Sequence, residues 1–340
     1  MNTLAHLRRT GLPLAVAASL TLVTACGASG PEEEAGSAAG GETAGGFPLT
    51  VEHAMGETEI PAAPERVLPL DFTYVDATLA LGGNVVGFTQ IAEGQDTLPD
   101  YLFESDWNKG SAEEAESVGL LWEVDPERVA QAEPDLILSA EVRHGDGYGQ
   151  LSEVAPTVMS ETTGASWKDN LRLTGEAMGM AEEADRLVSE FEERAAAIGE
   201  EIAESTDGEL PTVSVVRFAG DADGVRLYTR NSYIGVIMDD LGLPPSENTE
   251  TDSEEIATYH SPERLMDLEA DHILVATYDD GEAGEVAEDK ERYVTNPLWG
   301  ELEGTKTDVD DAYWMSGVGL ISAHAVLDDV AEIFGVDPQR

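Results

Sequence analysis

The sequence predicts an α/β protein of two Rossmann-like lobes joined by a long helix. Short apolar strands alternate with helices along most of the chain, which is typical of a layered α/β protein. One helical stretch of unusual length lies between the two halves. A strand-forming unit with the same internal spacing occurs once in each half, so we expect two lobes of similar construction.

Residues 1–25 contain the three parts of a secretory signal in order. Arg8 and Arg9 precede an apolar run over residues 12–23, and the small residues Thr24 and Ala25 follow it. The run is shorter than the roughly 18 to 20 apolar residues that a membrane-spanning helix needs. We therefore expect this segment to be removed on export, by the general or the twin-arginine route.

Cys26 follows the signal directly and is the only cysteine of the chain. The run Val23 to Cys26 resembles the lipobox of bacterial lipoproteins, which implies a lipid attached to Cys26. Residues 27–46 are almost wholly Gly, Ala, Ser, Thr, Pro and Glu, a composition that cannot bury a core. We expect residues 26–46 to be a flexible linker that holds the protein at the outer face of the cell membrane.

The chain is strongly acidic, with 69 Asp and Glu against 18 Lys and Arg and a formal net charge of −51. Binding to nucleic acid needs clustered positive charge, so we expect no nucleic-acid partner. Charge of this size bears on solubility rather than on fold, and an acidic surface adapted to salt is one interpretation. We expect a monomer.

The remaining chain is long enough for two cores, one over residues 47–166 and one over residues 207–340. A helix predicted at 74–81 ends at a pair of glycines, and another at 321–334 ends at Gly335, as helix C-termini often do. Five apolar runs are predicted strands: 66–70, 85–89, 135–139, 212–218 and 271–277.

Residues 167–206 are predicted to be the helix that connects the lobes. Apolar residues recur on one face of this stretch, which indicates an amphipathic helix. Gly175, Gly179 and Gly199 interrupt the pattern, and glycine inside a helix costs about 1 kcal/mol relative to alanine. A break near Gly179 would leave the architecture unchanged.

The repeated unit comprises residues 126–138 in one half and 262–274 in the other. The first copy begins Pro-Glu-Arg-Val and the second Pro-Glu-Arg-Leu, and both reach Glu-x-Asp-x-Ile-Leu at the same spacing. Asp125 and Ser261 precede the prolines and are residue types that cap helices. Each copy therefore predicts a capped short helix followed by a buried strand.

This unit resembles the paired segments of the periplasmic-binding family that captures ferric siderophores and cobalamin for ABC importers. Further stretches match that family in order along nearly the whole mature chain. They are Glu59–Pro61, Pro64–Val67, Tyr74–Ala77, Leu81–Gly82, Leu151–Ser152, Ala155–Val158, Trp314–Gly317 and Ala325–Asp329.

The resemblance implies a helical-backbone periplasmic-binding fold, with a rigid connecting helix, a shallow cleft and little hinge closure. It also implies that one glutamate of each lobe, here Glu127 and Glu263, docks on arginines of the ABC transporter permease. Exposed carboxylates on both lobes would fix the orientation of docking. Alternatively, both residues only complement the dipole of the helix that they begin.

The resemblance implies a ferric siderophore as ligand, with the iron held by the chelator and no protein cofactor. Arginines near strand ends or glycines are candidate ligand contacts, because guanidinium groups suit anionic oxygens and ligands of α/β sheets bind beyond the carboxyl ends of strands. Each could instead pair with a neighbouring acid. The candidates are Arg143, Arg217, Arg226 and Arg230.

Aromatic side chains in loops or beside glycines are further candidates to face the ligand, although some could belong to the core. Trp314 is preferred because its segment matches the family pattern. The set is Tyr74, Tyr148, Tyr228, Tyr278 and Trp314.

Two other functions remain open at this stage. A lipoprotein of a zinc or manganese importer would need several histidines, but His53, His144, His260, His272 and His324 form no histidine-rich loop, so we assign no metal ligand. A secreted hydrolase based on two carboxylates leaves no sequence signature, and the common nucleophile and metalloprotease motifs are absent, so we assign no catalytic residue. Cobalamin and haem remain alternative ligands.

Overall fold

The structure is a computed structural model that describes residues 46–249, 254–279 and 284–340. The predicted signal, Cys26 and all but the last residue of the predicted linker lie outside the described residues. Among the described helices, none is both long and apolar enough to cross a membrane.

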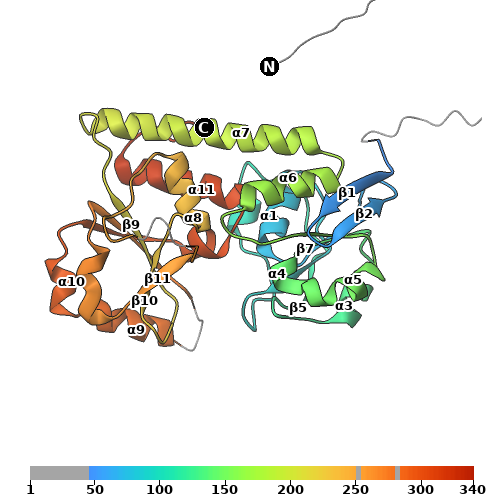
Figure 1. Ribbon diagram of the computed structural model, residues 1–340, viewed down its shortest axis with the longest axis horizontal. Helices are drawn as coiled ribbons and strands as arrows, with labels where there is room; N and C mark the ends of the chain where they lie inside the picture. Colours follow the sequence, from blue (N-terminus) through green and yellow to red (C-terminus); the bar gives the residue numbers. More distant parts are fainter. Residues whose placement is uncertain (1–45, 250–253, 280–283) are drawn as a thin grey trace, which may run out of the picture. The chain divides into compact units, whose positions relative to one another are not determined.

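The first lobe carries eight strands among short helices (Figure 1). Its strands are β1 (Leu49–His53), β2 (Gly56–Ile60), β3 (Val67–Pro69), β4 (Gly87–Gln90), β5 (Glu116–Leu120), β6 (Glu123–Val124), β7 (Leu136–Ala140) and β8 (Thr157–Ser160). Its helices are α1 (Phe72–Ala80), α2 (Tyr101–Glu104), α3 (Pro126–Gln131), α4 (Glu141–His144), the 3₁₀ turn η1 (Gly145–Gly147) and α5 (Tyr148–Ser152).

The central strands of this lobe are parallel. One sheet has the order β3-β7-β8 and a second has the order β4-β5-β6, with only β6 antiparallel. A parallel bridge between Val67 and Val85 joins the two sheets next to β3. The antiparallel strands β1 and β2 form a separate two-stranded sheet. Parallel strands place their carboxyl ends along one edge, where loops gather.

Two helices, not one, form the predicted connector: α6 (Trp167–Ala177) and α7 (Ala181–Ser205). The break falls at Gly179, whose φ of +70° is a conformation that residues other than glycine rarely adopt. Helix α6 packs on α1 of the first lobe, and α7 packs on α6 and on α8 and α11 of the second (Figure 1). The predicted single helix over residues 167–206 is therefore interrupted near Gly179, one of the three glycines that made a break possible.

The second lobe has a mixed five-stranded sheet of order β11-β10-β9-β12-β13. The strands β9, β12 and β13 are parallel, whereas β10 runs antiparallel to both of its neighbours, β9 and β11. The strands are β9 (Val213–Phe218), β10 (Val225–Tyr228), β11 (Ala257–His260), β12 (His272–Thr277) and β13 (Thr305–Val309). The helical elements are α8 (Tyr233–Asp240), the 3₁₀ helix η2 (Pro262–Leu268), α9 (Glu285–Val294), α10 (Pro297–Glu301), the π-helical turn η4 (Ala312–Ser316) and α11 (Leu320–Phe334).

The two copies of the repeated unit differ in their helices. Asp125 caps α3 as predicted, and its carboxylate accepts the amide of Glu127 at 2.9 Å. The prediction for the second copy is wrong in detail, because Ser261 makes no capping bond and η2 is a 3₁₀ helix with a kink at Arg264. The strands that follow, β7 and β12, are both buried as predicted.

One continuous apolar cluster extends through both lobes. It includes buried side chains of α1 and α6, of α7 and of α8 and α11, with Phe191 of α7 completely buried. Smaller clusters fill the far faces of the two sheets. The lobes are therefore packed against a shared core and not merely tethered by a helix.

A buried carboxylate joins the lobes at this core. Asp76 of α1 accepts the amides of Ile321 at 2.8 Å and Ser322 at 3.0 Å, and it also accepts the Ser322 hydroxyl. These amides belong to the first turn of α11, where backbone donors lack partners within the helix. Burial raises the pKa of Asp76 to about 6, against the hydrogen bonds that favour its charged form. The first lobe thus caps the last helix of the second.

Candidate ligand-binding cleft

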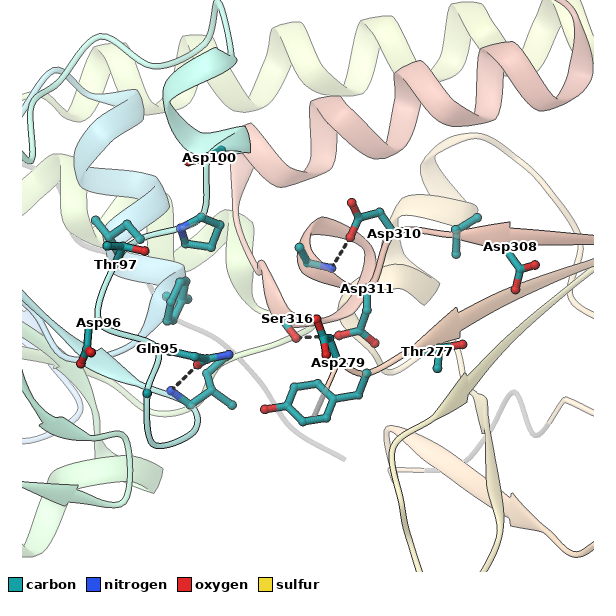
Figure 2. A pocket seen from close by; sticks show the side chains of 18 of the residues that line it. Gln95, Asp96, Thr97, Asp100, Thr277, Asp279, Asp308, Asp310, Asp311 and Ser316 are labelled. Carbon is teal, nitrogen blue, oxygen red and sulfur yellow. Dashed lines mark hydrogen bonds between the residues drawn. The ribbon is translucent and has the colours of Figure 1, made fainter. Parts of the chain in front are cut away.

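A cavity of about 660 Å³ opens between the lobes, at the carboxyl ends of strands from both (Figure 2). The segment 91–100 follows β4 and forms the wall of the first lobe, together with Phe72 at the start of α1. The segments 277–279 and 308–312 follow or end β12 and β13 and form the opposite wall. The position is the one where open α/β sheets bind ligands.

Hydrogen bonds within the segment 91–100 hold its shape. The side-chain oxygen of Gln95 accepts the amides of Ile91 and Ala92, each at 3.2 Å. Gln90 donates to the carboxylate of Asp96 at 2.9 Å. Leu98 is buried beneath the segment and anchors it to the lobe. The loop therefore presents exposed Asp96 and Asp100 to the cavity.

Arg217, at the carboxyl-terminal half of β9, lies under the wall of the second lobe. Its guanidinium forms a bidentate pair with Asp311 at 2.6 and 2.7 Å, and it donates to Ser316 at 3.1 Å. Tyr278 covers it with its ring centroid 5.4 Å away. Burial opposes the charge on Arg217, but Tyr228 and Asp311 outweigh it and raise the pKa of the guanidinium.

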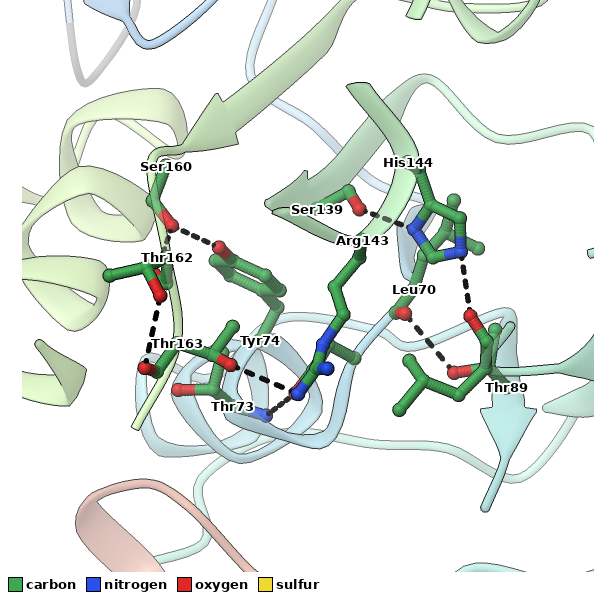
Figure 3. A network of polar contacts seen from close by, with 12 residues as sticks. Leu70, Thr73, Tyr74, Thr89, Ser139, Arg143, His144, Ser160, Thr162 and Thr163 are labelled. Atoms are coloured by element: carbon green, nitrogen blue, oxygen red, sulfur yellow. Dashed lines mark hydrogen bonds and ion pairs between the residues drawn. The ribbon is translucent and has the colours of Figure 1, made fainter. Parts of the chain in front are cut away.

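Arg143 lies on α4, directly after β7 of the first lobe, and is also paired. Figure 3 shows its side chain extending from α4 towards the start of α1 and Thr163. It donates to Asp71 at 2.9 Å and to the Thr163 hydroxyl at 3.2 Å. Asp71 also caps α1 by accepting the amide of Thr73. This carboxylate is therefore held by two partners.

Trp122 is an exposed aromatic residue that the sequence analysis did not single out. It follows β5, at the same carboxyl edge as the cavity wall, and 67% of its surface is accessible. The guanidinium of Arg143 lies over its ring, 4.6 Å from the centroid. His144 supports this corner, since its Nε2 is 2.9 Å from the Leu121 carbonyl oxygen and Ser139 contacts its Nδ1 at 2.7 Å (Figure 3).

Four other predicted contacts are not among the residues that line this cavity, although one of them, Tyr228, interacts with Arg217 beneath its wall. Arg226 pairs with Asp221 at 2.7 Å, and Arg230 pairs with Asp239. Tyr228 lies on β10 and accepts a bond from Arg226 at 3.4 Å. Tyr148 lies on α5, where its hydroxyl contacts that of Thr58 and its ring packs on His53. Their partners are local, which was the alternative stated for the arginines.

Two of the aromatic candidates, the preferred Trp314 and Tyr74, are core residues, and the expectation that their rings face a ligand is wrong for this structure. Trp314 is fully buried and donates its indole N–H to Asp329 at 2.8 Å. Tyr74 is 1% exposed, and its hydroxyl contacts Ser160 at 2.5 Å (Figure 3). Both rings fill apolar space while their polar atoms are satisfied, so a ligand in the cleft does not reach them.

Histidines are dispersed over the structure. Within the described residues, no three His, Cys, Asp or Glu side chains are grouped so that they could hold a metal ion. His324 is buried and stacks on Trp107 at 3.5 Å, and burial lowers its pKa to about 2. His272 packs on Phe334. These two side chains serve the packing of the lobes.

The family model described as periplasmic binding protein matches residues 70–308. The chain belongs to the periplasmic binding protein family. It is 32% identical over 295 residues to the probable siderophore-binding lipoprotein YfiY of Bacillus subtilis, with 84% of this chain and 87% of that protein covered. It is 26% identical to the Fe(3+)-citrate-binding protein YfmC of the same organism, with 81% of this chain and 82% of that protein covered.

A solved member of the family has a similar fold. The structure of Staphylococcus aureus SirA complexed with staphyloferrin B superposes with a TM-score of 0.74 at 28% sequence identity. The match covers 85% of this chain and 99% of that chain. The two-lobed α/β architecture predicted from the sequence is thereby confirmed.

The glutamates that the family resemblance singles out are both exposed and each follow a proline. Glu127 is in the first turn of α3 and Glu263 is in the first turn of η2. A hydrogen bond from the Ser261 hydroxyl lowers the pKa of Glu263, so this carboxylate stays charged. Helix α3, and the helices α9 and α10 that pack on η2, lie on the side away from α7 (Figure 1).

Proposed function

We propose that this chain is an extracytoplasmic solute-binding lipoprotein that binds a ferric siderophore between its lobes and delivers it to the permease of an ABC importer. The observation that carries the proposal is the 32% identity to the probable siderophore-binding lipoprotein YfiY, over 84% of this chain. YfmC, an Fe(3+)-citrate-binding protein, and the complex of SirA with staphyloferrin B support the same class of ligand.

The cavity suits such a ligand in size and place. Its volume of about 660 Å³ is within the range of about 300 to 1,000 Å³ that small-molecule sites usually have. It is lined by a few apolar side chains, among them Phe72, Ile91 and Val309, and by many polar ones. Trp122 and Arg143 extend the same edge of the first lobe, and we include them among the proposed ligand contacts.

The shared core limits how far the two lobes can move relative to each other. Because α1, α7 and α11 pack in one apolar cluster and Asp76 caps α11 across the lobes, large hinge closure would expose buried surface. We propose that the ligand binds in a largely preformed cleft. The permease then recognises both lobes through Glu127 and Glu263. The fixed distance between these residues would set the orientation in which the protein docks.

Attachment to the membrane completes the proposal. Cys26, directly after the predicted signal, would carry the lipid, and residues 27–46 would let the lobes turn towards the permease. Mass spectrometry of the exported protein tests this part. A diacylated Cys26 as the first residue is expected, and an unmodified chain that begins elsewhere would contradict it.

Fluorescence titration tests the ligand class. The protein without residues 1–25 is titrated with ferric hydroxamate, catecholate and citrate complexes, with the iron-free chelators, and with cobalamin, haem, Zn²⁺ and Mn²⁺. We expect saturable quenching by a ferric chelate and weaker binding of the same chelator without iron. A Trp122→Phe variant identifies the quenched residue, because 67% of Trp122 is exposed beside the cleft.

The alternatives give different results. Saturation only by bare Zn²⁺ or Mn²⁺ would replace the proposal by a metal importer's lipoprotein. Binding of cobalamin or haem alone would keep the carrier and change its cargo. If none of these compounds binds, the proposed function is wrong and hydrolysis of glycosides becomes the next activity to assay.

A further inference from the structure

The lining of the cleft has an excess of negative charge. Among the residues that the structure describes, six aspartates and one basic residue, Lys290, line the cavity, and no arginine does. In Figure 2, Asp96 and Asp100 lie on one side, and Asp279, Asp310 and Asp311 lie on the other. Because the whole chain is acidic, an acidic lining alone says little about the ligand. The partners of the basic side chains around the cleft say more.

Each basic side chain at the cleft already has a carboxylate partner. Lys290 donates to Asp308 at 2.5 Å and to the Thr277 hydroxyl at 3.0 Å. Arg217 is paired bidentately with Asp311. Arg143 is paired with Asp71.

The carboxylates that pair with the two arginines, Asp311 and Asp71, are difficult for a ligand to displace. The side chain of Asp311 is 9% exposed and that of Asp71 is 7% exposed. An anionic ligand that took either guanidinium would leave a buried carboxylate without its counter-charge, which is strongly unfavourable.

Two cleft carboxylates, in contrast, have only neutral partners among the described residues. Asp96 accepts from the Gln90 amide, and Asp310 accepts from the backbone amide of Ala312 at 2.9 Å. The ion pairs of the described residues include neither of these carboxylates, nor that of Asp100. Residues 250–253 and 280–283 contain no Lys or Arg that could add a cation.

We infer that the cleft selects ferric chelates without net negative charge, and prefers those with a positive group, such as a trihydroxamate with a free ammonium group. This inference rests on the proposed function. Three hydroxamates together neutralise ferric iron, whereas three catecholates leave three negative charges on the complex. A terminal ammonium group could approach Asp96 or Asp310, whose charges have no cationic partner among the described residues.

A matched pair of ligands tests the inference. One is a linear ferric trihydroxamate with a free terminal amine, and the other is the same chelate with that amine acetylated. They differ by one charge and have the same iron centre. We expect the ammonium form to bind about three- to tenfold more tightly at low salt, because a single favourable charge contact near a surface has roughly that value. We expect the difference to shrink as salt screens it.

Variants of the protein locate the effect. The double change Asp96→Asn and Asp310→Asn should reduce the ratio of the two affinities towards one. A second double variant, Asp185→Asn with Asp169→Asn on the exposed faces of α7 and α6, removes as many charges outside the cleft. It should leave the ratio unchanged, which separates the cleft carboxylates from the general acidity of the chain.

The outcomes are distinct. Preference for ferric tris-catecholate or ferric citrate would overturn the inference and leave the proposed function intact. Equal affinity for the two trihydroxamates, or a ratio that both double variants alter equally, would also overturn the charge preference. Failure to bind any ferric chelate would contradict the proposed function itself.

Discussion

The pair between Arg217 and Asp311 provides a direct test of how the second wall of the cleft is built. Asp311→Asn keeps the shape of the side chain but leaves the buried guanidinium without its counter-charge. The side chains are 12% and 9% exposed, and removing one partner of a buried pair typically costs about 3–5 kcal/mol. Asparagine still offers one acceptor oxygen, so we expect a loss of about 3 kcal/mol in the free energy of unfolding.

Asp185→Asn is the matched control for this change. Asp185 pairs with Arg172 at 3.0 Å, but its side chain is 69% exposed and Arg172 keeps Asp169 as a second partner. An exposed pair of this kind contributes about 0–1 kcal/mol. Both variants remove one negative charge, so relief of overall repulsion is similar in each.

Urea denaturation, followed by circular dichroism at constant pH and salt, measures the difference. We expect Asp311→Asn to lower the midpoint clearly with an unchanged denaturant slope, and Asp185→Asn to leave it almost unaltered. If the two variants unfold within about 0.5 kcal/mol of each other, the pair does not stabilise the wall as described. The argument that an anionic ligand cannot displace Asp311 would then fail as well.

Three further predictions concern helix α7, the buried Asp76, and the exposed Glu127 and Glu263. Gly199→Ala in α7 would place a methyl group on the Leu241 carbonyl oxygen and should cost about 2 kcal/mol in urea, whereas Gly300→Ala in α10 meets no atom within 4 Å and should gain up to about 1 kcal/mol. Because burial raises the pKa of Asp76 from 3.8 to about 6, its contribution to stability is greatest below about pH 4 and is lost as pH rises through 6. The stability of the wild type relative to Asp76→Asn should fall by about 2 kcal/mol from pH 4 to 7, and a constant difference would contradict this. Replacing Glu127 and Glu263 by alanine should leave ligand affinity unchanged and reduce uptake by the importer about tenfold or more, and normal uptake would refute docking through these residues.

The architecture could be predicted because its signals are local. All five apolar runs that were predicted as strands are strands, and Gly335, with φ of +68°, ends α11 where a C-terminal glycine was expected. The break at Gly179 was visible because glycine is the residue that a left-handed turn favours. The second repeat was harder, since a proline and a serine do not distinguish a 3₁₀ helix from an α-helix.

The cleft was harder to predict because its residues meet only in the folded chain. Arg217 was correctly placed near a strand end, but its partner Asp311 is 94 residues away in sequence. The segment 91–100 is polar and aperiodic, so nothing marked it as a wall of the cavity. Trp314 was misjudged because it was preferred for the family pattern of its segment, and that pattern does not distinguish an exposed ring from a buried one. In the structure it is buried and donates to Asp329.

The contact between Asp76 and α11 also bears on how the protein is assembled. The carboxylate and its partner Ile321 are 245 residues apart, so the cap forms only after nearly the whole chain is present. Until then, the first lobe holds a carboxylate without its donors and an apolar face without its cover. Helix α11 is therefore the piece that finishes the first lobe, and a chain cut before residue 320 would have an incomplete core and be exposed to proteases.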